Sequence, residues 1–470
     1  MDTIQRSYES QSDGPKYRAV ANAIRQSISD GALAIDEKLP PVRDLAWRLQ
    51  ITPGTVARAY TLLVEEGALY AEVGRGTFVA KPTRVAALRD VHRDRQFQRH
   101  VDPIETGTVS MFAPKLPNLG QAGLIHDSFA RMSQRPEAEL LSYPGRSLSL
   151  GAQKASLRWL SGVELGPVNE QDLILSHGSQ NGIVLILQAV LKGANPVILV
   201  EELSYPGFRR AAQLMRAEVV AVPMDDHGVI PAELNRLARK HNAQVFCTCP
   251  EVHNPTNLVT PASRRREIAE VAKATGLHII QDESYQLRQP SAPSYRALVP
   301  ETGWYVTSIS KSLTPALRVG FVFAPKPNRS AVRQAAEHGF FGLATPLTFV
   351  IEDILSRPET QVMADEIRAT LRNYIHAAVN ALGGYKISWH PEVPYIWLCL
   401  PEGWRASAFA QAAEAHGAQV RTAEDFVPRN GFAPHAVRLS INAEVSLASY
   451  ESALARLREL LDHPPEAIMV

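Results

Sequence analysis

Lys311 is the residue whose type and surroundings say most about chemistry. It lies in the run SISKSLTPALRVG at positions 308–320, close to the hydroxyls of Ser308 and Ser310, and Arg318 follows seven residues later. A lysine amine can carry an aldehyde as a Schiff base, while hydroxyls and a guanidinium can hold a phosphate. Pyridoxal 5'-phosphate is the cofactor that needs all of these groups. The segment therefore predicts a pyridoxal 5'-phosphate site with Lys311 as its Schiff-base residue.

Four residues upstream fit the same cofactor. Asp282 can keep the pyridine nitrogen protonated, which makes the ring an electron sink. Tyr285 and Asn254 can hydrogen-bond the ring oxygen, and Tyr205 can stack on the ring. Each residue alone has an ordinary structural explanation, such as packing of an aromatic side chain before a proline. Their combination in this order and spacing indicates a cofactor site.

Gly178, Ser179 and Gln180 form a candidate phosphate-binding turn, because they open an apolar helical stretch. Small residues at a helix start let backbone amides reach a phosphate. An ordinary strand–helix turn has the same pattern, so the segment supports the cofactor prediction only together with Lys311.

The elements that must position these residues are short apolar strands separated by helical stretches. Strand candidates occupy residues 173–175, 197–200, 219–222, 245–247, 278–280, 305–306 and 319–323. This alternation predicts an α/β fold with a mostly parallel seven-stranded sheet covered on both faces. Ligands in such sheets bind at the carboxyl ends of the strands. Gly178, Tyr205, Asn254 and Asp282 all follow strand candidates and are expected at that edge.

Length and composition bound the class of protein. A chain of 470 residues is too long for one ordinary core, so two or three domains are expected. Hydrophobic content of 45% and charged content of 21% are typical of soluble globular proteins. The sequence contains no long apolar run for a membrane span, and its start lacks the apolar core of a signal peptide. Three cysteines without a zinc spacing predict reduced thiols, no metal site and a cytoplasmic location.

The segment 12–80 has the order of elements of a winged helix-turn-helix. An apolar stripe at helical spacing predicts a first helix that Gly31 ends. Two prolines then precede a predicted short second helix. Thr52 is a natural N-cap of the next helix and Pro53 its natural first residue. The glycine-rich segment 67–79 then predicts a two-stranded wing.

The second helix of a helix-turn-helix enters the major groove of DNA. Contacts with bases or phosphates are predicted for Arg43, Thr52, Thr55, Arg58, Arg75 and Gly76. The order of elements resembles the GntR family of winged-helix transcription regulators, and this resemblance implies double-stranded DNA as a partner. A winged helix used for protein contacts is the alternative. The basic segment 81–108 is interpreted as an interdomain linker, which is either plain or an additional phosphate contact.

The third segment, 109–465, resembles the fold-type I aminotransferases over roughly residues 110–462. The resemblance implies a smaller C-terminal α+β subdomain and a role for Arg438 in binding the carboxylate of the ligand. A guanidinium offers two parallel hydrogen bonds to a carboxylate. An ordinary arginine on a surface strand is the alternative. Tyr143 resembles a tyrosine that reaches the phosphate of a partner subunit.

A GntR-type winged helix followed by an aminotransferase-like domain resembles the MocR subfamily of bacterial regulators. The resemblance implies a homodimer that binds an operator with two half-sites. It also implies that a small amino compound displaces Lys311, forms an external aldimine and thereby shifts DNA binding. A functional aminotransferase that carries a DNA-binding domain is the main alternative. A repressor whose large domain only dimerises is the third.

Overall fold

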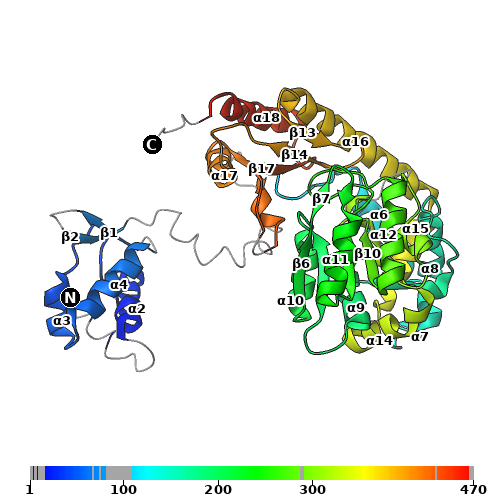
Figure 1. Cartoon of the computed structure of the whole chain (residues 1–470), viewed down its shortest axis with the longest axis horizontal. Helices are drawn as coiled ribbons and strands as arrows, with labels where there is room; N and C mark the ends of the chain where they lie inside the picture. Colours follow the sequence, from blue (N-terminus) through cyan, green and yellow to red (C-terminus); the bar gives the residue numbers. More distant parts are fainter. Residues whose placement is uncertain are drawn as a thin grey trace. The chain divides into compact units, whose positions relative to one another are not determined.

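The computed structural model describes residues 4, 8, 16–65, 68–72, 76–80, 108–285, 290–428 and 431–464. The chain divides into two compact units, Met1–Glu105 and Thr106–Val470 (Figure 1). Arg75 and nearly all of the predicted basic linker, 81–107, lie outside the described residues.

The N-terminal unit consists of helices around one small core and a hairpin. Its elements are α2 (Lys16–Ser29), α3 (Val42–Arg48), α4 (Pro53–Glu65), β1 (Leu69–Glu72) and β2 (Gly76–Val79). Val20 and Ile24 of α2 are buried against Val56 and Leu63 of α4, as expected for an apolar helical stripe. The two strands pair antiparallel. This arrangement confirms the predicted winged helix-turn-helix.

The second unit is built on a seven-stranded sheet with the order β4-β12-β11-β10-β9-β5-β6. Its strands are β4 (Leu173–Ser176), β5 (Val197–Glu201), β6 (Glu218–Val222), β9 (Val245–Thr248), β10 (His278–Asp282), β11 (Gly303–Ser308) and β12 (Gly320–Phe323). Strand β12 is antiparallel to both of its neighbours, and the other neighbouring pairs are parallel. All seven predicted strands are present, which confirms a mostly parallel sheet.

Helices cover both faces of this sheet, and alternate residues of one strand therefore enter different cores. Ile198 and Val200 of β5 pack with residues of α9, α10 and α14, whereas Leu199 packs with residues of α11 and α12. The helices of the first face are α9 (Gly178–Val190), α10 (Pro206–Leu214) and α14 (Arg329–Phe340). Those of the second face include α11 (Pro231–His241), α12 (Ala262–Thr275) and α13 (Tyr295–Leu298).

A smaller subdomain closes the chain and confirms the predicted α+β arrangement. It contains α16 (Pro358–Leu382), β13 (Ile387–Trp389), β14 (Tyr395–Cys399), α17 (Ala406–Ala415), β15 (Ala418–Gln419), β16 (Arg421–Thr422), β17 (Ala436–Ser440) and α18 (Leu447–Asp462). Its antiparallel sheet has the order β13-β14-β17-β16. Strand β3 (Val109–Ser110) pairs with β15, so the start of the unit is part of this subdomain.

The remaining elements of the second unit connect or flank these layers. They are α6 (Gln121–Met132), α7 (Glu137–Leu140), α8 (Arg146–Trp159), α15 (Thr345–Ser356), β7 (Met224–Asp225) and β8 (Gly228–Val229). Helices α8 and α15 pack against each other and against the β4–β12 end of the sheet. Among the described residues, no helix combines the length and apolar character that a membrane span requires.

Candidate functional site

Lys311 lies in a single 3-10 turn (Ile309–Lys311) directly after β11. The Ser308 side chain begins this turn, because its hydroxyl oxygen accepts a hydrogen bond from the Ser310 backbone N–H at 3.3 Å. The Lys311 side chain is half-buried. Burial, followed by the charges of Arg438 and Arg318, lowers the pKa of Lys311 to about 8. An amine with this pKa is partly neutral near pH 7 and can act as a nucleophile.

Asp282 ends the neighbouring strand β10. Its Oδ1 accepts from the backbone N–H of Ser284 at 3.0 Å and from the Ser284 hydroxyl at 2.6 Å. Burial raises the pKa of Asp282 to about 6, against the lowering effect of these hydrogen bonds. Among the described residues, no cation forms an ion pair with this carboxyl group. A buried acid of this kind fits a partner that supplies a protonated ring nitrogen.

Gly178 and Arg318 meet at the first turn of α9. Gly178 has a φ of +78°, and a Cβ atom there would lie 2.6 Å from Nη2 of Arg318. The Arg318 guanidinium therefore lies against the N-terminus of an apolar helix, which is a favourable place for a phosphate. The hydroxyl oxygens of Ser310 and Ser312 are buried without a hydrogen-bond partner among the described residues. These observations fit a phosphate group and thus the predicted cofactor.

The side chains of Tyr205 and Gln180 are hydrogen-bonded to each other beside the N-terminus of α9. The Tyr205 hydroxyl donates to Oε1 of Gln180 at 3.0 Å, and the Gln180 amide donates to the carbonyl of Gly207 at 3.0 Å. Gln180 therefore orients the ring that was predicted to stack on the cofactor. The Ser179 hydroxyl oxygen lies 2.9 Å from that of Ser284, which joins this turn to the end of β10.

Arg438 lies on β17 and is 2% exposed. Its Nη1 donates to Oδ1 of Asn254 at 2.8 Å, and its Nη2 donates to the carbonyl of Phe112 at 3.0 Å and to the Ser440 hydroxyl at 3.2 Å. All of these acceptors are neutral, and within the described part of the chain the buried Nε has no partner. Burial lowers the pKa of Arg438. Such a buried guanidinium fits the negatively charged group of a ligand.

Asn254 and Tyr285 complete the predicted set on either side of Arg438. The Asn254 carbonyl oxygen is used by Arg438, so the amide N–H groups of Asn254 are the ones that can reach a cofactor oxygen. The Tyr285 ring contacts that of Tyr395 edge-on, with centroids 5.0 Å apart. Burial raises the pKa of Tyr285, which keeps its hydroxyl protonated and able to donate.

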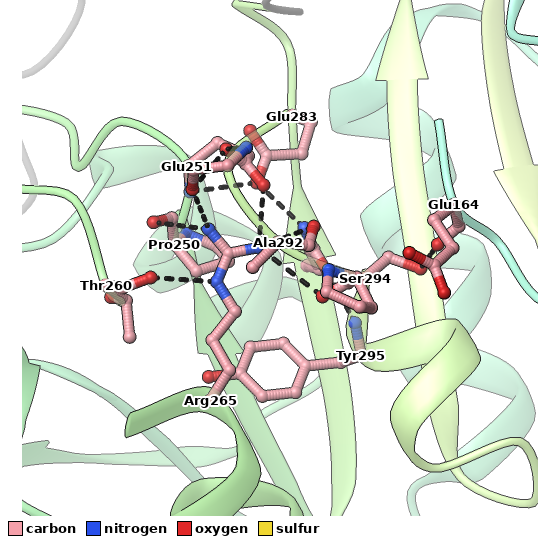
Figure 2. A network of polar contacts seen from close by, with 12 residues as sticks. Glu164, Pro250, Glu251, Thr260, Arg265, Glu283, Ala292, Ser294 and Tyr295 are labelled. Atoms are coloured by element: carbon pink, nitrogen blue, oxygen red, sulfur yellow. Dashed lines mark hydrogen bonds and ion pairs between the residues drawn. The ribbon is translucent and has the colours of Figure 1, made fainter. Parts of the chain in front are cut away.

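A buried arginine supports the segment that carries Asn254 (Figure 2). Arg265 of α12 donates from Nη1 to Oε1 of Glu251 at 2.6 Å, from Nη2 to the carbonyl of Pro250 at 3.1 Å, and from Nε to the carbonyl of Thr260 at 2.9 Å. The arginine is fully buried. It therefore fixes both ends of the loop that follows β9.

Glu283 links this network to the segment of Asp282. Its Oε1 accepts from the backbone N–H of Glu251 at 3.2 Å and from the Gln281 amide at 2.9 Å. Burial and the Glu251 carboxylate raise the pKa of Glu283 to about 8, so its carboxyl group holds a proton at neutral pH. One arginine and two acids, labelled in Figure 2, thus tie the loop after β9 to the end of β10. Asn254 lies in that loop, and Asp282 is the last residue of β10.

This network was not predicted from the sequence. Glu251 and Glu283 follow buried strands and lie close in sequence to Asn254 and Asp282, which is a signal that could have identified them. Arg265 carries no such signal, because it is the middle of three consecutive arginines in an amphipathic helix. Only packing distinguishes it from its exposed neighbour Arg266.

The predicted DNA contacts lie on separate elements of the N-terminal unit. Arg43 is exposed on α3, and Thr52 and Thr55 share a hydrogen bond of 2.8 Å at the start of α4. The exposed Arg58 guanidinium lies 4.2 Å from the centroid of the Tyr17 ring. Gly76 opens β2 with a φ of +122°, which favours glycine. Their contacts with DNA stay predictions.

Comparisons with known proteins agree with both units. The family model of aminotransferases of class I and II matches residues 129–457, and that of the bacterial regulatory proteins of the gntR family matches residues 16–79. The HTH-type transcriptional regulator YdeF of Bacillus subtilis is 26% identical over 455 residues, which is 95% of each chain. The vitamin B6 salvage pathway transcriptional repressor PtsJ of Salmonella typhimurium is 26% identical over 425 residues, or 88% of this chain and 92% of the relative.

The fold of the second unit also occurs in solved aminotransferases. The crystal structure of the kynurenine aminotransferase of Pyrococcus horikoshii aligns with a TM-score of 0.66 and 19% identity, over 80% of this chain and 98% of the other. The chain therefore belongs to the class I and II aminotransferase family, whose cofactor is pyridoxal 5'-phosphate, and its gntR-type domain makes it a DNA-binding transcription regulator of the MocR type.

Proposed function

We propose that this regulator senses a small amino compound at Lys311 and that ligand binding changes its affinity for DNA. The observation that carries the proposal is the pairing of Lys311 with Arg438. Both cations lie in one site, the charge of Arg438 contributes to the lowered pKa of Lys311, and neither has an acidic partner among the described residues. A site of this kind favours a ligand with one amine and one acidic group.

Each residue of the proposed site has a separate role in binding the ligand or the cofactor. Arg438 binds the acidic group of the ligand, and the amine of Lys311 gives way to that of the ligand. Gly178, Ser310 and Arg318 hold the phosphate end, while Asp282 holds a proton on the ring nitrogen. When bound, the cofactor supplies an aldehyde that amines occupy reversibly. The ligand alters DNA binding only if its affinity differs between two states of the protein, and such coupling is typically about 1–3 kcal/mol.

The proposal includes a homodimer in the cytoplasm that binds two half-sites of one operator as direct or inverted repeats. Three large apolar side chains of the second unit support dimerisation: Leu141 is 87% exposed, Tyr143 79% and Phe341 63%. The rings of Tyr143 and Phe341 stack with centroids 5.3 Å apart, so the exposed surface is continuous there. Footprinting should show two protected half-sites, and Arg58→Ala should weaken both. Protection of a single short site by a monomer would contradict this arrangement.

An aminotransferase that carries a DNA-binding domain is the second candidate function. It is favoured by the completeness of the site, since the pKa of Lys311 near 8 also suits an amine that moves protons. Multiple turnovers of an amino donor and a keto acid would support it. A single spectral change without turnover would support sensing.

The deciding experiment screens primary amines against the cofactor-loaded dimer. Each compound is scored first by the change in visible cofactor absorbance and then by DNA affinity. Under the proposal, the compounds that change the absorbance also change DNA affinity, and Lys311→Ala removes the reducible link to the cofactor without unfolding the protein. Efficient transamination with unchanged DNA affinity would replace the sensor with the enzyme.

A further inference from the structure

Arg421 is a second arginine beside Arg438 to which the sequence analysis gave no role. It lies on β16, directly opposite Arg438 in the antiparallel ladder with β17. Side chains of directly opposite residues project from the same face of a sheet, with Cβ atoms roughly 5 Å apart. Both guanidinium groups also approach the ring of Phe426, at 5.6 Å for Arg421 and 5.1 Å for Arg438. Two like charges therefore lie side by side.

The protein neutralises this pair of charges only in part. Asp425 accepts a hydrogen bond from Nε of Arg421 at 2.9 Å. Among the described residues, the two Nη atoms of Arg421 have no hydrogen-bond partner, and Nε of Arg438 is buried without one. One carboxylate, bonded to Arg421 and not to Arg438, is thus what the described residues offer to two guanidinium groups. The excess positive charge favours a further anion at this place.

The charge of Arg421 acts on the pKa of two tyrosines that are predicted to flank the cofactor. Burial raises the pKa of Tyr285, while the charges of Arg438 and Arg421 lower it. The pKa of Tyr205 is likewise raised by burial and lowered by Arg210 and Arg421. The charge of Arg421 therefore acts on both tyrosines. Together with the ladder position, this places the guanidinium at the ligand end of the site.

We propose that Arg421 binds a second acidic group of the ligand, so that the regulator prefers amino acids with two acidic groups. This inference rests on the proposed function, because it assigns the class of compound that reaches Lys311. Arg438 binds the first carboxylate, and the Nη edge of Arg421 forms parallel hydrogen bonds with the second. The two arginines together then distinguish an acid from the amide of equal size, since only the acid neutralises both charges.

Asp425 sets the strength of this second interaction. Its backbone carbonyl accepts from the Arg209 guanidinium, which also donates to the carbonyl of Val427 and thus holds the turn. The Asp425 carboxylate contacts Arg421 through Nε and competes with the ligand for its charge. Loss of this carboxylate should therefore strengthen binding of a diacid, whereas loss of Arg421 should weaken it. A purely structural ion pair predicts the same direction for both changes.

The experiment titrates the cofactor-loaded full chain with L-aspartate, L-glutamate and their amides L-asparagine and L-glutamine, using visible cofactor absorbance. The wild type should bind one diacid at least about tenfold more tightly than its amide. Arg421→Gln should weaken the diacid by roughly tenfold to hundredfold, the usual range for a hydrogen bond to a charged group, and change the amide by less than about twofold. Arg458→Gln, on the exposed face of α18, is the matched control and should change neither.

Two further variants keep the test decisive. Asp425→Asn should raise the diacid affinity, and a loss like that of Arg421→Gln would identify the Asp425–Arg421 contact as a structural ion pair. Arg421→Lys, which keeps the charge and loses the planar fork, should give an intermediate loss and replaces Arg421→Gln if that variant does not fold.

Equal affinities for diacid and amide, or equal weakening of both by the Arg421 variants, would overturn the inference and leave the proposed function intact. A response to other amines but to none of these four compounds would do the same. A failure of every primary amine to change the absorbance would overturn both.

Discussion

Two buried arginines of the second unit differ in the charge that surrounds them. Arg265 donates to the carboxylate of Glu251 and to backbone carbonyls that enclose it. Arg438, buried as well, donates only to neutral acceptors among the described residues. A buried charge is costly without a partner, so an arginine with an internal carboxylate holds the fold, whereas one without it suits an external anion.

Two buried acids near these arginines, Glu283 and Asp282, differ in their charged surroundings in the same way. Glu283 lies in the Arg265 network, and burial together with the Glu251 carboxylate raises its pKa. Asp282 has a raised pKa because burial acts on it without a described cation nearby. Among the described residues, the support network thus pairs its arginine with a carboxylate of the protein, whereas the site in front of it fits the charged groups of a cofactor and a ligand.

The largest expected effect comes from removing the internally paired arginine. Arg265→Met should lower the free energy of unfolding by roughly 3–5 kcal/mol, because Glu251 loses its counter-charge in a buried position. Denaturant unfolding of the cofactor-free protein measures this loss. Arg266→Gln, on the exposed side of the same helix, should change stability by less than about 0.5 kcal/mol. Similar values for the two variants would remove the basis of the comparison.

The matched change at the other arginine should act on ligand binding instead. Arg438→Gln should weaken an acidic amine by about 1.5–3 kcal/mol, the range for a hydrogen bond to a charged group. Cofactor binding should persist, because no phosphate contact is assigned to this residue. Absorbance titration gives the ligand affinity, and the unfolding assay gives the stability. A loss of stability as large as that of Arg265→Met would show that Arg438 is structural.

The pH dependence of stability should further distinguish the Arg265 network from the cofactor site. The pKa of Glu283 is raised from 4.5 to about 8, so its contribution to stability is present below pH 4.5 and is lost as the pH rises through 8. Glu283→Gln cannot ionise and should remove this loss, which is at most about 1.4 kcal/mol per pH unit for one proton. The test is the free energy of unfolding of the wild type and of Glu283→Gln, measured at several pH values between 4.5 and about 8. An unchanged slope would exclude Glu283 as the titrating group.

The smallest expected effect is a shift in the pH profile of cofactor attachment. Only the neutral amine of Lys311 reacts, so the rate should rise roughly tenfold per pH unit below about 8 and level off above it. Arg438→Gln removes one of the positive charges that lower this pKa and should move the profile to higher pH. The rate of absorbance change after adding cofactor to the apo-protein measures both profiles. Identical profiles would mean that the charge of Arg438 does not contribute to the lowered pKa of Lys311.

Much of the fold could be predicted because its signals are local. The inner strands of the large sheet are buried on both faces, so they are short apolar runs that helical patterns separate. The winged helix was recognisable for a similar reason, since turns and helix starts depend on nearby glycine, proline and threonine residues. A mostly parallel sheet was predicted, but not which strand would be antiparallel. An apolar run contains no information about its direction, so the antiparallel β12 could not be identified.

The sequence by itself determined which chemistry is present: Lys311, Asp282 and Arg438 were identifiable by residue type and order along the chain. Tertiary structure alone decided which arginines are neutralised. Arg265 and Arg421 resemble many surface arginines in sequence, and only folding brings Arg265 to Glu251 and places Arg421 opposite Arg438. Electrostatic energy depends on distance and on burial, and both are properties of the folded chain rather than of residue order.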